Sequence, residues 1–469
     1  MIYMARTSGT FMAFLCLVLT PLACLTEGFT VVASTRWRAA IRDLAPARAR
    51  SNRGSGDAAF WVDRLAGLAL ALYCLAGTWG LHRVMGLDPS LWWQPRSWAV
   101  AGLLWLAWWP RGARPGRGQP CGSVVAVELV WLGVSALALI WAPDIELASA
   151  ATIDLALMAL VALALHRLVR RGDAAALIDA FERAMLGLLL LLMAAAVAGG
   201  IGPGRLATLG GGPNVFGRNM GLLCVLALDR AMRGHGSTRP VRHEGLARFA
   251  WPSIAAFAGM LVALSGSRGA MFSTAIALAC LMILGRARLA RRLAVVAGFV
   301  VLALVVVATT ELGAHVASSF ATRVLDLFFR EHYVSGRDRI YVIALEGGFE
   351  APLVGHGLAS FPAATKWPYA HNIVLDAWFE TGALGVAALA LYFATAARAT
   401  LVARAHERVA ARWVGIDGLR AAALLILVAS QFSGGRYDAR GLLVLVALSL
   451  VHFARSRPTF DPTPTRTRP

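Results

Sequence analysis

The sequence lacks the motifs of nucleotide-driven and metal-bound chemistry. It has no Walker loop and no dinucleotide fingerprint, and Gly210-Gly211-Gly212-Pro213 has neither the lysine nor the strand context of a phosphate-binding loop. The six cysteines are scattered, mostly through apolar stretches, without paired spacing, which argues against a disulfide framework and a zinc site. We therefore expect no cofactor and no metal, with energy that comes from the substrate or from a gradient.

Long polar segments are also scarce. Of the 469 residues, 58% are hydrophobic, and no segment is large and polar enough to form a separate soluble domain. Apolar stretches close to the roughly 20 residues that span a bilayer recur from end to end. They lie near 11–33, 61–81, 97–109, 123–142, 147–166, 178–199, 215–230, 249–266, 269–285, 293–312, 371–396, 419–433 and 440–455. The expected fold class is an all-α polytopic membrane protein with about 12–13 transmembrane helices.

Lysine is nearly absent, with Lys366 alone, and acidic residues are few, so the net charge is +19. The arginines that produce this charge are concentrated in alternate loops, and the loops between them are short or less basic. The basic loops are 36–53, 111–117, 167–171, 230–248, 286–292 and 398–412. This is the positive-inside pattern, so the charge indicates cytoplasmic loops beside anionic membrane lipids rather than nucleic-acid binding.

The chain is expected to form a single polytopic membrane domain over residues 34–455. Residues 1–33 are either an extra N-terminal span or a signal-like segment, and a retained span is preferred because cleavage would place the basic stretch 36–53 outside. The longest connection, 313–370, falls outside the cytoplasm and carries two helical patterns, at 316–328 and 340–345. Residues 456–469 are expected to be a disordered cytoplasmic tail.

Polar residues of the kind that carry chemistry gather at the outer ends of several spans. His371-Asn372 is followed by nine residues and then by Gly382-Ala383-Leu384-Gly385, where the long loop re-enters an apolar helix. An ionisable imidazole at a membrane edge is costly to keep without a use. Three arginines are expected on the same side, namely Arg205, Arg268 and Arg337. A guanidinium presents a planar fork of donors that matches phosphate oxygens, so this set suits a lipid-linked pyrophosphate.

Residues 371–385 resemble the signature of the bacterial O-antigen ligase and polysaccharide polymerase family, which is His-Asn, nine residues and Gly-x-x-Gly. The resemblance covers roughly residues 200–390. It also includes Gly204-Arg205 with Pro213-Asn214, Ser267-Arg268-Gly269, Gly336-Arg337, and Pro352-Leu353-Val354-Gly355-His356-Gly357. It implies a glycosyltransferase-C-like fold in the bacterial inner membrane, with an active site facing the periplasm.

The resemblance further implies an enzyme that moves a glycan from undecaprenyl pyrophosphate to a sugar hydroxyl, on lipid A core or a similar acceptor. His371 would be the general base, and Arg268 and Arg337, with Arg205 as a weaker candidate, would bind the pyrophosphate. A helix start after Pro368 and nearby arginines disfavour a protonated imidazole, which suits a base. No metal is needed, because pyrophosphate is a good leaving group once it is positioned and neutralised.

A set of five residues that follow His371 in the sequence is expected to support the site. Asn372 continues the motif, and Asp376 and Glu380 follow it at helical spacing, where they either orient the site or pair with arginines of neighbouring helices; pairing is preferred. Gly382 and Gly385 are interpreted as positions of close helix packing. His356 is interpreted as a solvated loop histidine.

Two other functions remain open. A polymerase would use the same donor and a growing glycan as acceptor, and the family does not separate it from a ligase, although the clean His-Asn signature favours a ligase. A lipid-linked oligosaccharide transporter is disfavoured, because it would need mid-membrane charges and symmetric halves with broken helices. The polar residues gather instead at one face.

Overall fold

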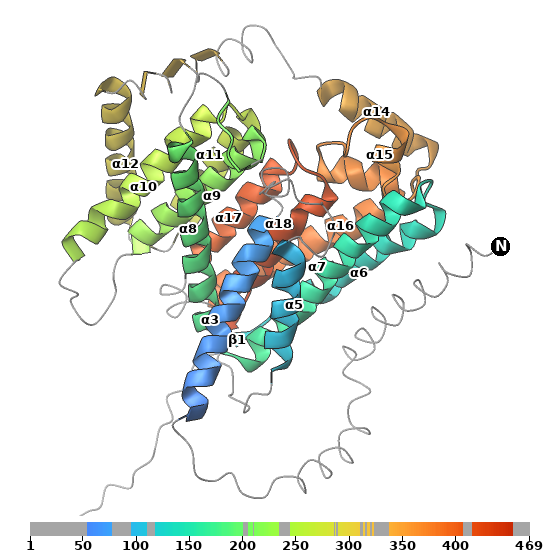
Figure 1. Cartoon of the computed structure of the whole chain (residues 1–469), viewed down its shortest axis with the longest axis horizontal. Coiled ribbons are helices and arrows are strands. Elements are labelled where there is room, and N and C mark those ends of the chain that lie inside the picture. The colour runs from blue at the N-terminus through green and yellow to red at the C-terminus, as the bar shows by residue number, and fades with distance from the viewer. Residues whose placement is uncertain are drawn as a thin grey trace, which may run out of the picture.

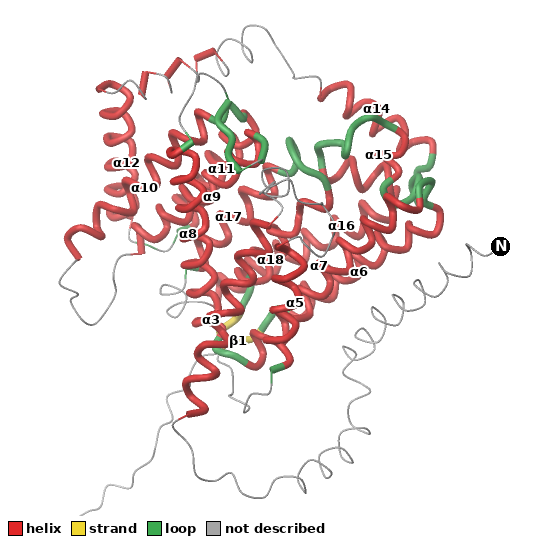
Figure 2. The backbone as a smooth tube through the Cα atoms, viewed as in Figure 1, coloured by secondary structure: helices red, strands yellow, loops and turns green. Residues whose placement is uncertain are grey.

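The computed structural model describes residues 54–76, 95–109, 118–199, 205–209, 211–233, 244–285, 287, 289–309, 313–314, 317–318, 321–322, 337–406 and 415–453. These residues are helical apart from loops and two short strands (Figure 2). The strands β1 (Gly118–Gln119) and β2 (His452–Phe453) have two residues each and pair antiparallel. The all-α fold class expected from the sequence is confirmed.

A helix occupies every predicted span that falls within the described residues. In order these are α3 (Gly54–Leu75), α5 (Pro95–Trp108), α6 (Gly122–Leu137), α7 (Ile145–Arg171), α8 (Ala174–Ala198), α9 (Pro213–Arg233), α10 (Glu244–Leu264), α11 (Arg268–Leu284), α12 (Leu289–Thr309), α16 (Ile373–His406), α17 (Ile416–Ala429) and α18 (Arg440–Ser449). The 3-10 helix η3 (Ala138–Trp141) extends α6. The predicted span 11–33, the helical pattern at 316–328 and the tail after 455 lie outside the described residues.

Four of the described helices are long and apolar enough to cross a membrane by length and composition. They are α6 with η3, α7, α8 and α16. The chain is therefore a membrane protein with several candidate spans. The total of 12–13 spans stays a prediction, because other helices at the predicted positions are shorter or less apolar.

The helices pack into two apolar cores. In the first, α3 packs on α5 and α8, α9 packs on α10, and α11 packs on α17. In the second, α6 packs against both α7 and α16, and the Trp131 and Tyr392 rings stack at 6.1 Å between centroids. The helix α18 contacts both groups. Figure 1 shows α18 in the middle of the molecule, with α10 and α12 on one side and α6 and α16 on the other.

The described part of the long connection folds as a cap over the start of α16. It contains α14 (Arg337–Glu350), where the sequence predicted the second helical pattern of the loop, and the short α15 (Ser360–Ala364). Both lie beside α16 at one edge of the molecule (Figure 1). A small separate core joins them, made of Ile340, Ala344, Phe361, Ala370 and Phe379. The cap thus has its own apolar support, which fixes the residues that lead into α16.

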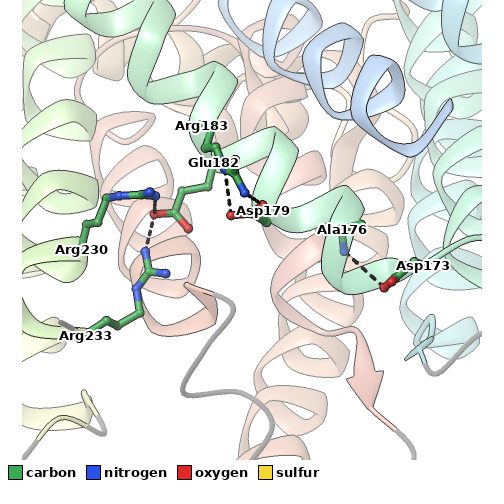
Figure 3. Close-up of polar contacts among 7 residues, drawn as sticks. All are labelled: Asp173, Ala176, Asp179, Glu182, Arg183, Arg230 and Arg233. Carbon is green, nitrogen blue, oxygen red and sulfur yellow. Dashed lines mark hydrogen bonds and ion pairs between the residues drawn. The ribbon is translucent and has the colours of Figure 1, made fainter. Parts of the chain in front are cut away.

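A buried carboxylate ties α8 to the end of α9. Glu182 is 1% exposed and forms ion pairs with Arg230 and Arg233 (Figure 3). Arg233 also pairs with Asp229, with 2.8 Å between Nε and Oδ2. A charge this deeply buried is tolerable only when it is paired and hydrogen-bonded.

Replacing Glu182 with glutamine is expected to lower the free energy of unfolding by roughly 3–5 kcal/mol, because it leaves two partly buried arginines without their shared anion. Thermal unfolding in detergent measures the effect. The matched control is Asp179→Asn, one helical turn away, where an exposed pair with Arg183 is lost and a change below about 1 kcal/mol is expected. Equal melting temperatures for the two variants would contradict a stabilising role for the buried pairs.

Candidate active site

His371 lies at the entry to α16 in a conformation that few residues adopt. Its φ is 59°, in the left-handed region, which for a residue other than glycine costs about 1–2 kcal/mol. Asn372 holds the adjoining backbone, because its Oδ1 accepts hydrogen bonds from the amides of Val374 at 2.9 Å and Leu375 at 3.1 Å. The helix therefore begins after an asparagine cap, and the histidine stands just outside its first turn. The Tyr369 ring packs edge-on against the imidazole, with 4.6 Å between centroids.

Arg268 and Arg337 come from distant parts of the chain and interact. Arg268 is the first residue of α11, where the Ser267 side chain caps the helix by accepting from the Ala270 amide at 3.3 Å. Arg337 is the first residue of α14. Burial lowers the pKa of Arg337; the neighbouring phenols of Tyr341 and Tyr369 oppose this, and the positive charge of Arg268 adds to it. Two close like charges are unfavourable alone and favour binding of an anion between them.

A turn between α17 and α18 holds the pieces of this site together. The Gln431 carbonyl accepts hydrogen bonds from the Tyr341 hydroxyl at 3.1 Å and from Nδ2 of Asn372 at 3.4 Å. The Ser430 carbonyl accepts from the Ile373 amide at 3.1 Å. This turn, residues 430–436, therefore joins α14 to the cap of α16. Sequence reasoning did not select it, because its contacts are made by backbone carbonyls, which leave no residue-type signal.

Asp376 and Glu380 converge on one buried arginine of that turn. Arg436 opens the 3-10 helix η6 (Arg436–Ala439) and is 0% exposed. Its guanidinium forms an ion pair with Glu380, and its amide donates to Asp376 at 3.2 Å. Asp376 also accepts from the Ala370 amide at 2.6 Å, directly before His371. The pairing preferred from the sequence therefore holds for Glu380, and Asp376 braces the histidine through the backbone.

Arg436 was missed from the sequence. The signal was present, because Gly434-Gly435-Arg436-Tyr437-Asp438 interrupts two apolar segments with charges. An arginine within the apolar C-terminal part of a membrane chain calls for a named partner. The two carboxylates of α16 were the available partners, 56 and 60 residues away.

The segment that carries most of these residues matches a known protein family. Residues 253–390 match the model of the O-antigen ligase family. This stretch is an O-antigen ligase domain. The chain therefore contains a domain of the family whose enzymes transfer lipid-linked glycans. No curated protein matches the chain.

The O-antigen ligase domain holds most of the residues selected from the sequence. Arg268, Arg337 and the stretch from His371 to Gly385 all fall inside the matched range, which is narrower than the 200–390 expected. Arg205 falls outside it. Its Nε donates to the Ser265 carbonyl at 3.2 Å and its Nη2 to Oδ1 of Asn214 at 2.9 Å. Arg205 thus supports the turn that leads to Arg268.

The ligase domain bends at Gly382, and this corrects an interpretation made from the sequence. Gly382 was read as a site of close helix packing, but it has φ 60° and ψ −158°, which are not helical. The bend lets the loop run along α16, where the Ala383 amide donates to the Pro352 carbonyl at 2.8 Å and the Gly357 amide donates to the Glu380 carbonyl at 3.0 Å. A packing role for Gly385 stays a prediction.

His356 also differs from its interpretation as a solvated residue. Its Nε2 lies 2.7 Å from the Gly347 carbonyl oxygen, and its ring packs on Phe379 with 4.8 Å between centroids. Trp141 at the end of η3 donates to the Gly355 carbonyl at 3.2 Å. The motif from Pro352 to Gly357 thus has a structural role: it joins α14 to the rest of the cap, and the cap to α16 and η3.

Replacing Gly382 with alanine is expected to destabilise the ligase domain by roughly 1–3 kcal/mol, the usual cost of backbone strain at a position open mainly to glycine. A Cβ there would also lie 2.6 Å from the Leu353 carbonyl carbon. The melting temperature in detergent checks this. Gly133→Ala in α6 serves as control, because a Cβ at Gly133 meets nothing within 4 Å and alanine is the better helix former. A Gly382→Ala variant that melts with this control would contradict the strained bend.

Proposed function

We propose that the chain transfers a glycan from undecaprenyl pyrophosphate to a sugar hydroxyl of lipid A core or a similar acceptor. The observation that carries the proposal is the continuous set Arg268, Arg337, Tyr369 and His371. Arg337 interacts electrostatically with Arg268 and with Tyr369, and Tyr369 packs against His371. These contacts support a site in which a cationic pair binds pyrophosphate beside a group able to accept a proton.

In this reaction each residue has one task. His371 removes the proton from the acceptor hydroxyl as its oxygen attacks the anomeric carbon of the glycan. The bond between that carbon and the pyrophosphate oxygen breaks, and the electron pair leaves with the lipid pyrophosphate. Arg268 and Arg337 neutralise the charge that develops on this leaving group. Transfer without a metal ion remains a prediction, and activity in the presence of a chelator tests it.

We further propose that the site faces the periplasm of the inner membrane. Support comes from the direction of α9, which begins near Arg205 and ends in Arg230 and Arg233, next to a basic loop. The last turn of α7 is also basic, with Arg170 and Arg171. By the positive-inside rule these ends belong to the cytoplasm, so the start of α9 and its neighbours point the other way.

A ligase and a polymerase share this donor, and the acceptor that each uses distinguishes them. Purified protein is incubated with a synthetic undecaprenyl-pyrophosphate oligosaccharide, without nucleotide or divalent metal, and either lipid A core or a second donor molecule serves as acceptor. Glycosylated lipid A core identifies a ligase, and elongated donor identifies a polymerase. Absence of transfer to both acceptors would contradict the proposed donor chemistry and would favour a transporter.

A further inference from the structure

A cavity with several polar side chains in its lining lies inside the helix bundle, next to the turn that supports the active site. Its volume is about 40 Å³, and side chains of α3, α8, α9, α17 and α18 line it. Its polar lining consists of Arg218 and Asn219 on α9 and Arg440 on α18, with Cys74 on α3 at its edge. None of these residues was selected from the sequence.

From this cavity we infer a second phosphate site, formed by Arg218, Asn219 and Arg440. It rests on the proposed function only for the source of the phosphate, which is the undecaprenyl-linked headgroup of donor or product. The two arginines and the amide all offer hydrogen-bond donors, and no residue lining the described cavity is acidic. The cavity is thus built for an anion.

Asn219 gives the strongest sign that the cavity binds a hydrogen-bond acceptor. Its side chain is 3% exposed, and its Nδ2 is buried without a hydrogen-bond partner among the residues that the structure describes. A buried donor left without an acceptor costs roughly 1–3 kcal/mol. A phosphate oxygen in the cavity would supply the acceptor.

The charge balance points the same way. Arg440 also lines a neighbouring cavity of about 10 Å³, together with Glu128 and Tyr73. Arg218 has a different polar contact, because its Nη1 donates to the Ser433 carbonyl at 3.3 Å. Among the residues that line these two described cavities, Glu128 is the one acid beside Arg218 and Arg440. A phosphate oxyanion would balance the remaining positive charge in its apolar surroundings.

The cavity is small, with a volume of about 40 Å³. One water molecule needs roughly 10–15 Å³ of such space. The cavity therefore suits a small anionic group such as a phosphate better than a sugar ring.

The cavity is connected to the active site through residues 430–440. Ser433, which Arg218 contacts, lies two residues after Gln431, whose carbonyl holds Tyr341 and Asn372. Arg440 directly follows η6, whose first residue pairs with Glu380. A phosphate bound here would therefore fix the turn on which the cap and the histidine depend.

The test is direct binding of radiolabelled inorganic phosphate and of undecaprenyl phosphate to the full-length protein in detergent. Binding is measured in an Arg337→Gln background, which weakens the pair at the active site and leaves the cavity intact. Asn219→Asp is the key variant, because it keeps the shape of the side chain and adds a carboxylate to the cavity that the two arginines line. We expect it to weaken phosphate binding at least tenfold and to leave the melting temperature unchanged or raised.

The control is Arg183→Gln, which lowers the net charge by one, as Asn219→Asp does, but at an exposed ion pair. This control should bind phosphate as the parent does. Loss of binding of both ligands in Asn219→Asp supports a general phosphate site, and loss confined to undecaprenyl phosphate supports a lipid headgroup site. Equal binding by Asn219→Asp and the parent, or no phosphate binding by the parent, would overturn the inference and leave a water-filled cavity. These readings need no glycan transfer, so they stand apart from failure of the proposed function.

Discussion

Replacing His371 with alanine is expected to lower the rate of glycan transfer by about 100- to 10,000-fold, the usual contribution of a positioned general base. Alanine can accept no proton from the acceptor hydroxyl, whereas the cationic pair Arg268 and Arg337 is left in place. The initial rate of glycan transfer from an undecaprenyl-pyrophosphate oligosaccharide measures the effect.

A second variant separates the loss of the base from a change in shape. Glutamine keeps a polar side chain at His371 without a basic nitrogen, so His371→Gln is expected to be as inactive as the alanine variant. Both variants should melt close to the parent, because Asn372 still caps α16. Transfer by either variant within a few-fold of the parent would refute the assignment of His371 as the base.

Replacing Arg436 with alanine is expected to destabilise the protein by roughly 3–5 kcal/mol, because it leaves a buried carboxylate without its cation. Arg436 is 0% exposed and pairs with Glu380, which is 3% exposed. The fall in melting temperature in detergent is the measurement. Transfer should fall as well, since the same segment holds Asp376, and Asp376 holds the backbone before His371.

The control removes both charges together. Arg436→Met combined with Glu380→Leu leaves neither ion unpaired, and buried pairs replaced by apolar residues are often neutral or stabilising. The double variant should therefore melt above Arg436→Ala and close to the parent. If Arg436→Ala alone melts like the parent, the pair does not hold the start of α16 in place.

Sequence patterns predicted the helices well because hydrophobic length and periodicity are local properties. A helix occupies every predicted span within the described residues, including the short stretches 97–109 and 419–433. The charge pattern could also place Arg268, Arg337 and His371 at one face, because alternate loops lie on alternate sides of a membrane.

The features that escaped prediction depend on contacts between distant segments. Tyr369 packs on His371 and also interacts electrostatically with Arg337, 32 residues earlier in the chain, and no sequence spacing predicts that link. The carbonyl of Gln431 binds partners 90 and 59 residues away. Gly382 follows a helical pattern on both sides, so only the fold shows that the loop requires a bend there. Tertiary contacts of this kind carry no periodic signal.

The most direct test of the site is the affinity of three proteins for the donor, measured beside their transfer rates. His371→Ala should bind an undecaprenyl-pyrophosphate oligosaccharide as the parent does and transfer almost none of it. Arg337→Gln should bind the donor at least tenfold more weakly, because half of the cationic pair is gone. Donor affinity lost in His371→Ala, or kept in Arg337→Gln, would contradict a site in which arginines hold the pyrophosphate and the histidine takes the proton.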